Sequence, residues 1–168
     1  MSIKKISGKA KLVYMDDIDT DQIFHQSLLT IHNPQEIKPH IFGNLKGFEN
    51  FGKENHEGEI VVVGKNFGKG STRQQAVTGF LAHKIEAIVG ESFGPIYYSN
   101  AVNSGLLLIE APGISQLPID NRDTLEINIE EAIITNLNKE KEMKFKTIPK
   151  PVLDIMEAGG LLKLGEEM

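Results

Sequence analysis

The alternation of apolar and polar positions along the chain predicts a mixed α/β fold. Two runs, 8–14 (GKAKLVY) and 59–63 (EIVVV), are typical of strands, and the second is a β-branched run before a glycine. Between them, Asn33-Pro34 indicates a helix start, with Asn as the N-cap and Pro in the first helical position. The segment 43–58 is rich in glycine and is expected to be a loop.

The middle of the chain alternates helices and strands. After Ser71, apolar residues recur with the spacing of one helix face. Segments 85–90 and 106–111 predict strands on either side of a helix over 93–105. Strands that alternate with helices favour a sheet covered by helices. The apolar face of the first helix consists of Ala76, Val77, Phe80, Leu81 and Ile85.

The last third of the chain has a different pattern. Residues 124–131, 132–137 and 141–148 alternate apolar and polar positions, which predicts antiparallel strands near the surface. The segment 149–164 predicts a helix that starts at a proline and is stopped by Gly159-Gly160. Residues 1–168 are therefore expected to form a single α/β domain.

Composition narrows the classes of function. The chain has 168 residues and 40% hydrophobic content, which suit one globular domain. A net charge of -5 and a pI near 5.6 argue against a nucleic-acid partner. No apolar run approaches the roughly 20 residues of a membrane span, and the first residues lack the apolar core of a secretory signal, so a cytoplasmic location is expected. The absence of cysteine excludes a thiol nucleophile and an iron–sulfur cluster ligated by cysteines of this chain.

The loop 64–76, GKNFGKGSTRQQA, has the composition of an anion site. It is not a Walker A loop, because Lys69 stands where the second glycine belongs. Ser71 and Gln74 have the spacing of a capping box at a helix start. The free backbone N–H groups of such a first turn, with Arg73 beside them, would bind a carboxylate or a phosphate. That Ser71 only caps a helix is the alternative.

Two further segments carry polar residues that deserve an interpretation. The segment 16–23, DDIDTDQI, begins like a calcium loop, but Gln22 and Leu28 replace the required glycine and glutamate. Its simplest interpretation is a polar turn in which aspartates accept backbone hydrogen bonds. The segment 24–32 places the apolar SLLTI between two histidines. The five histidines are scattered, which argues against a zinc site.

Taken in order, three motifs resemble one family: the small subunits of isopropylmalate dehydratase and homoaconitase, equivalent to the swivelling domain of aconitase. They are DDIDTDQI, GKNFGKGSTRQQA and ESFGPIYYSNAVNSGLLLI. The departures are Thr72 where serine is usual, Gln74-Gln75 where glutamate and histidine are common, and Phe24-His25 where isoleucine and proline are expected.

The resemblance implies a three-layer β/β/α swivelling domain and a reversible dehydration that moves a hydroxyl between neighbouring carbons of a malate-type acid. It also implies a large-subunit partner, in a heterodimer or heterotetramer, which carries a [4Fe-4S] cluster, with no metal bound by this chain. By this resemblance Ser71 is the base, present as an alkoxide, Thr72 and Arg73 bind a substrate carboxylate, and Asp19, Thr20 and Asp21 support the site.

The resemblance also gives an expectation for the substrate. The loop 24–32 would contact the variable group of the acid through Leu28, Leu29 and Thr30. Relatives that handle homoaconitate resemble Tyr-Leu-Arg-Thr here, and Leu29 stands where their arginine does. A leucine cannot offset the desolvation of a carboxylate, so 2- and 3-isopropylmalate are favoured, as in leucine biosynthesis. Homoaconitate and 2,3-dimethylmalate stay open as substrates, and a stand-alone anion-binding regulatory module is the alternative from another class.

Overall fold

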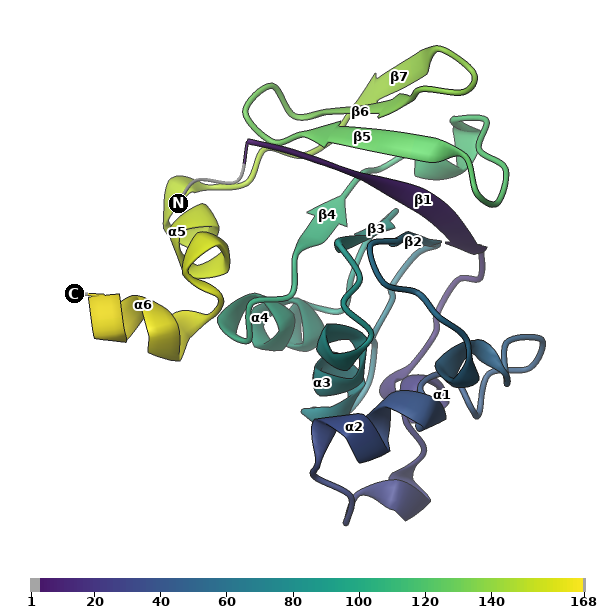
Figure 1. Cartoon of the computed structure of the whole chain (residues 1–168), viewed down its shortest axis with the longest axis vertical. Coiled ribbons are helices and arrows are strands. Elements are labelled where there is room, and N and C mark those ends of the chain that lie inside the picture. The colour runs from purple at the N-terminus through teal and green to yellow at the C-terminus, as the bar shows by residue number, and fades with distance from the viewer. Residues whose placement is uncertain (1–3, 168) are drawn as a thin grey trace.

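The computed structural model describes residues 4–167, and they contain a seven-stranded mixed sheet (Figure 1). Its strand order is β4-β3-β2-β1-β5-β6-β7. The first four strands are mutually parallel, and β5 pairs with β1 in the antiparallel sense. The strands are β1 (Lys5–Val13), β2 (Ile60–Val63), β3 (Ala87–Gly90), β4 (Leu108–Glu110), β5 (Thr124–Asn128), β6 (Ile133–Asn136) and β7 (Lys141–Lys144).

Helices cover the parallel half of the sheet, with α2, α3 and α4 on the side away from β5–β7 in Figure 1. Short 3-10 turns interrupt the connections, among them Gln26–Leu28, Lys38–His40 and Phe51–Lys53. The α-helices are α1 (Thr20–Ile23), α2 (Pro34–Ile37), α3 (Gln75–Ala82), α4 (Pro95–Asn103), α5 (Lys150–Ala158) and α6 (Leu161–Glu167).

The parallel strands lie between two cores. All side chains of β2 and β3 are buried, because successive residues of a strand point to opposite faces and both faces are covered. Val61 belongs to a core that includes Phe80 of α3, whereas Val62 belongs to a second core with Ile127 of β5. The antiparallel strands, the parallel strands and the helices are thus three layers, which confirms the predicted β/β/α fold.

Most predicted elements are present, although their bounds differ: β1 begins at Lys5, three residues before the predicted strand 8–14. The predicted strand 85–90 is β3 without its first two residues, and the predicted strand 106–111 is β4 without its first two residues and its last one. Asn33 caps α2, as its Oδ1 accepts a hydrogen bond of 2.9 Å from the N–H of Gln35. Gly159 ends α5 with φ 88°, a conformation that favours glycine.

The predicted capping box of Ser71 and Gln74 is wrong. Helix α3 begins only at Gln75, and Gln74, its N-cap, makes no side-chain capping bond. The reason is a competing set of contacts: the hydroxyl of Thr20 donates to the Ser71 carbonyl at 2.8 Å, and Arg73 reaches across to the same segment. These contacts with a segment about 50 residues away keep 71–73 out of the helix.

Two histidines are buried where helix α3 ends. His83 is 2% exposed, and its Nε2–H donates to the carbonyl of Lys38 at 2.8 Å, while its Nδ1 has no partner among the residues described. The ring of His56 lies 5.4 Å away, centroid to centroid. Burial first, and then the neighbouring His56 and Lys38, lower the pKa of His83 from 6.5 to about 4, despite the opposing effect of the Lys38 carbonyl.

This lowered pKa predicts an acid-sensitive fold. As the pH falls from 6.5 to about 4, the unfolded chain binds a proton at His83 that the folded chain does not. The free energy of unfolding should therefore decrease by about 3 kcal/mol as the pH falls through that range. Above pH 6.5 this contribution is constant. His83→Gln should flatten the dependence, and His32→Gln, at an exposed histidine, should not. Urea unfolding at several pH values measures it, and equal slopes for His83→Gln and the parent chain would contradict it.

Candidate active site

The loops that follow the parallel strands meet at one edge of the sheet. The segments after β1, β2 and β3 are 14–19, 64–74 and 91–94. Single β-bridges join Asp19 to Lys69 and Phe67 to Phe93, so the three loops are in direct contact. In open α/β sheets this carboxyl edge is where ligands bind.

The glycine loop lies flat against helix α4. Gly68 has φ +83°, and a Cβ built there would stand 2.3 Å from the ring of Tyr97, so a larger residue is excluded on both grounds. The hydroxyl of Tyr97 donates to the carbonyl of Ala76 at 2.8 Å and is buried. One aromatic side chain thus supports the loop before Ser71 and holds the start of the helix after it.

The aspartate segment holds the glycine loop from the other side. The Oδ1 of Asp16 accepts from the N–H of Lys65 at 2.8 Å, and Asn66 Nδ2 donates to Asp17 Oδ1 at 3.0 Å. Asp19 forms a capping box with Gln22, with bonds of 2.8 and 3.0 Å. The interpretation of 16–23 as a polar turn is therefore only partly right: its aspartates accept hydrogen bonds, but Thr20–Ile23 is helix α1, capped by Asp19, and Asp16 and Asp17 bind the neighbouring loop.

Ser71 and Thr72 lie on the surface of this edge, and both are exposed. Among residues 4–167, no acceptor is found for the backbone N–H groups of 71–75, five in succession. The free backbone N–H groups predicted for this segment are thus present, although the predicted capping box of Ser71 and Gln74 is not. Such a run of N–H groups favours an anion.

Arg73 is anchored beside these N–H groups. Its side chain is 12% exposed, and its Nη1 donates to Asp21 Oδ1 at 2.9 Å and to the carbonyl of Phe24 at 3.0 Å. The N–H of Gln26, and after it Arg73, holds the pKa of Asp21 below its ordinary value. The guanidinium has five N–H donors in a fixed plane, so Nη2 and Nε stay available to a carboxylate.

The loop 24–32 lies next to 71–75. Leu28 is half-buried against the core, whereas Leu29, 38% exposed, and Thr30 project from the surface. The Nε2 of Gln75 donates to the carbonyls of Leu29 and Ile31 at 3.1 and 3.2 Å. The structure therefore brings all the predicted site residues into one region.

The sequence does not predict the hydrogen bonds that Gln75 makes with the loop 24–32. In the sequence, Gln75 is only a departure from the family motif, and no neighbouring residue indicates its hydrogen-bond partners. A polar side chain among Ala76, Val77 and Phe80, on the buried face of a helix, is the one available signal, because a buried amide needs partners.

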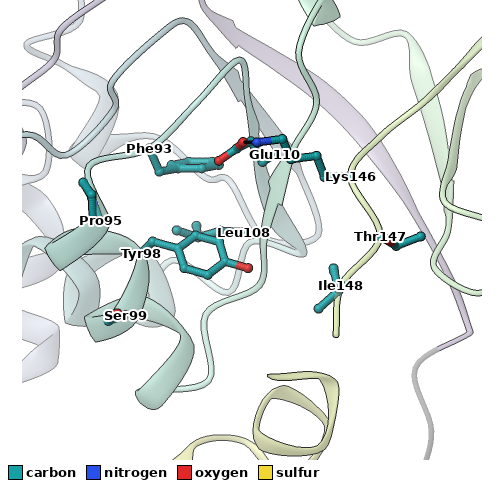
Figure 2. A pocket seen from close by; sticks show the side chains of 9 residues that line it. All are labelled: Phe93, Pro95, Tyr98, Ser99, Leu108, Glu110, Lys146, Thr147 and Ile148. Atoms are coloured by element: carbon teal, nitrogen blue, oxygen red, sulfur yellow. Dashed lines mark ion pairs between the residues drawn. The ribbon is translucent and has the colours of Figure 1, made fainter. Parts of the chain in front are cut away.

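A cavity of about 380 Å³ lies elsewhere, between α4, β4 and the segment 146–148 (Figure 2). Phe93, Tyr98 and Leu108 line it, and an ion pair between Lys146 and Glu110 crosses its rim. None of the predicted site residues contributes to it. The candidate site is instead the exposed loop surface around Ser71.

Within 4–167, no three His, Cys, Asp or Glu side chains are grouped so that they could hold a metal ion. Across the same residues, no helix is both long and apolar enough to cross a membrane.

The chain is similar to known proteins over most of its length. Residues 2–113 match the model of the aconitase C-terminal domain. The 3-isopropylmalate dehydratase small subunit of Aquifex aeolicus is 37% identical, over 90% of this chain and 89% of its own. The isopropylmalate/citramalate isomerase small subunit of Methanocaldococcus jannaschii is 37% identical, over 88% and 86%. A crystal structure of a 3-isopropylmalate dehydratase from the same organism superposes with a TM-score of 0.87 at 36% identity, over 97% of this chain and 94% of that one.

Proposed function

This chain belongs to the aconitase C-terminal domain family, and on that premise we propose that it is the small subunit of a 3-isopropylmalate dehydratase. The enzyme would interconvert 2- and 3-isopropylmalate in leucine biosynthesis, in the cytoplasm. The observation that carries the proposal is a pair of similarities: small subunits of this name match the chain at 37% and 39% identity over 90% or more of its length.

The second component of the enzyme would be a large subunit with a [4Fe-4S] cluster. The chain has no cysteine, so cysteine ligands for a cluster have to come from elsewhere. When bound, the cluster supplies a Lewis-acidic iron for the substrate hydroxyl and one carboxylate. The exposed edge around Ser71 is the surface that would face it, because a base and a metal must reach the same substrate.

In this proposal Ser71 moves the proton. Its hydroxyl oxygen, as an alkoxide, takes the proton from the carbon next to the one that loses hydroxyl, and returns a proton to carbon in the hydration step. A serine alkoxide needs strong stabilisation. The run of free N–H groups from 71 to 75 and the nearby Arg73 guanidinium provide donors and positive charge for it.

Thr72 and Arg73 would bind a carboxylate of the substrate. Thr72 is an exposed residue whose N–H has no acceptor among residues 4–167, and Arg73 is held in place by Asp21 with donors to spare. Asp19 and Thr20 support this arrangement indirectly, since Asp19 caps α1 and Thr20 holds the Ser71 carbonyl.

Leu28, Leu29 and Thr30 would receive the variable group of the acid. An isopropyl group gains from contact with leucine, while a third carboxylate would lose its hydration without a partner. Citramalate, with a methyl group, is a second candidate, because the Methanocaldococcus jannaschii relative is named for both acids. 2,3-Dimethylmalate has an apolar group of similar size, and homoaconitate is disfavoured at Leu29.

The test is anaerobic reconstitution with a cluster-bearing large subunit. The chain alone should show no dehydratase activity, and the complex should have its highest kcat/KM with isopropylmalate and a lower one with citramalate, dimethylmalate and homocitrate. Leu29→Arg should raise kcat/KM for homocitrate, and Leu137→Arg, at another exposed leucine, should not. Activity of the chain alone, or a preference of the parent complex for a tricarboxylate, would reject the proposal. Binding of nucleotides in place of these acids would favour a regulatory module.

A further inference from the structure

The side chain of Gln75 joins the segment that carries Ser71 to the loop that carries Leu29. Its residue is 8% exposed, and its Nε2 donates to the carbonyls of Leu29 and Ile31 at 3.1 and 3.2 Å. A side-chain amide nitrogen has two hydrogens, so these two bonds use both of them. Two carbonyls on either side of Thr30 therefore depend on one buried group.

The loop has little else to fix its tip. Leu28 and Ile31 pack against the core that includes Phe80. The two residues between them, Leu29 and Thr30, are exposed. Local backbone bonds shape the turn, because the N–H of Leu29 donates to the carbonyl of Gln26 at 3.3 Å, and that of Ile31 to Leu28 at 3.0 Å. Only Gln75 among the described residues ties this tip to the segment after Ser71.

The role of Gln75 can be tested separately from those of Arg73 and Gln74, because the three side chains have different partners. Arg73 holds the beginning of the loop, at the carbonyl of Phe24, and Gln75 holds its end. Gln74, between them, points elsewhere: its Nε2 donates to the hydroxyl of Ser104, at the end of α4, at 3.0 Å. Gln74 is exposed and is thus a matched control in the same segment.

We propose that Gln75 is a positioning residue that sets substrate specificity. By fixing the tip of the loop, it fixes how far the Leu29 side chain stands from Ser71, and so the size of the group accepted beside the reacting carbons. This inference rests on the proposed function. An apolar pocket distinguishes acids that differ by a methyl or methylene group only by ~1–3 kcal/mol, and only while its walls keep their place.

The first test measures the loop in the full chain without any substrate. Gln75→Leu keeps the approximate volume and removes both donors, whereas Gln75→His keeps one N–H and should rescue part of the effect. Amide hydrogen exchange at Leu28, Leu29 and Ile31 should become about fivefold to tenfold faster in Gln75→Leu, the factor expected from a lost hydrogen bond. Gln74→Leu should exchange like the parent chain.

The second test measures specificity in the reconstituted complex. The ratio of kcat/KM for isopropylmalate to that for citramalate should fall about fivefold or more in Gln75→Leu, with an intermediate value in Gln75→His. KM for isopropylmalate should rise, and kcat should stay within about threefold, because the base is untouched. A residue needed only for folding would not change the ratio of two substrates.

The outcomes separate the two proposals. Unchanged exchange in Gln75→Leu overturns the positioning role, whatever the activity. Faster exchange with an unchanged substrate ratio overturns the specificity role. If the parent complex turns over neither acid, the proposed function fails and the specificity role with it, whereas the exchange result still decides whether Gln75 holds the loop.

Discussion

Ser71→Ala should lower kcat of the reconstituted dehydratase by about a thousandfold or more, with KM within about tenfold of the parent value. A base acts in the transition state, so its loss reduces turnover without a comparable loss of substrate binding. In this structure the substitution removes the Ser71 hydroxyl and leaves the described hydrogen bond of the residue in place. Ser71 is exposed, and its one described hydrogen bond uses its backbone carbonyl, which accepts from Thr20 and is retained by alanine.

Steady-state kinetics with isopropylmalate measures this effect, and thermal unfolding of the isolated chain checks that the fold is unchanged. Ser99→Ala, at an exposed serine of α4, is the matched control and should keep full turnover. More than a tenth of the parent turnover in Ser71→Ala would remove the base assignment and leave Ser71 a residue of the loop only.

Arg73→Lys should raise KM by about tenfold to a hundredfold, with a smaller change in kcat. In the proposed function the Arg73 guanidinium would do two things: Nη1 holds Asp21 and the Phe24 carbonyl, and its remaining N–H donors would bind a carboxylate. A lysine ammonium is a single point of charge and cannot keep the anchor while also offering a planar pair of donors.

The control for Arg73→Lys is Arg122→Lys. These are the only two arginines in the chain, and Arg122 is exposed, next to β5 and far in sequence from the loop. Kinetics at several substrate concentrations separates KM from kcat. An unchanged KM in Arg73→Lys would show that Arg73 holds the loop and does not bind the acid.

The fold could be predicted from local patterns because its parallel strands are covered on both faces and its antiparallel strands on one. The apolar run at 59–63 and the alternating segments after Thr124 distinguish a doubly covered strand from singly covered ones, and β2 and β5 show this difference. The signals at Asn33-Pro34 and Gly159 depend on the backbone and on contacts within one turn, so they also hold.

The start of helix α3 and the contacts of Gln75 could not be predicted in the same way. Ser71 has a good local pattern for a cap, but the hydroxyl of Thr20, 51 residues earlier, takes its carbonyl. Gln75 bonds to Leu29, 46 residues earlier. Both are long-range contacts, and residue spacing within a segment carries no information about them.

The pairing of β1 has a consequence for how the chain folds. β1 pairs with β2, and Lys5 of the same strand lies opposite Asn128 of β5, so the middle of the sheet joins residues more than a hundred positions apart. Contacts of such long sequence separation slow folding, because a large loop must close before they form. The match to the family model ends at residue 113, before β5 begins. A chain that stopped there would leave β1 with an unpaired edge and Val62 without its cover, so the antiparallel half is needed to complete the sheet that supports the Ser71 loop.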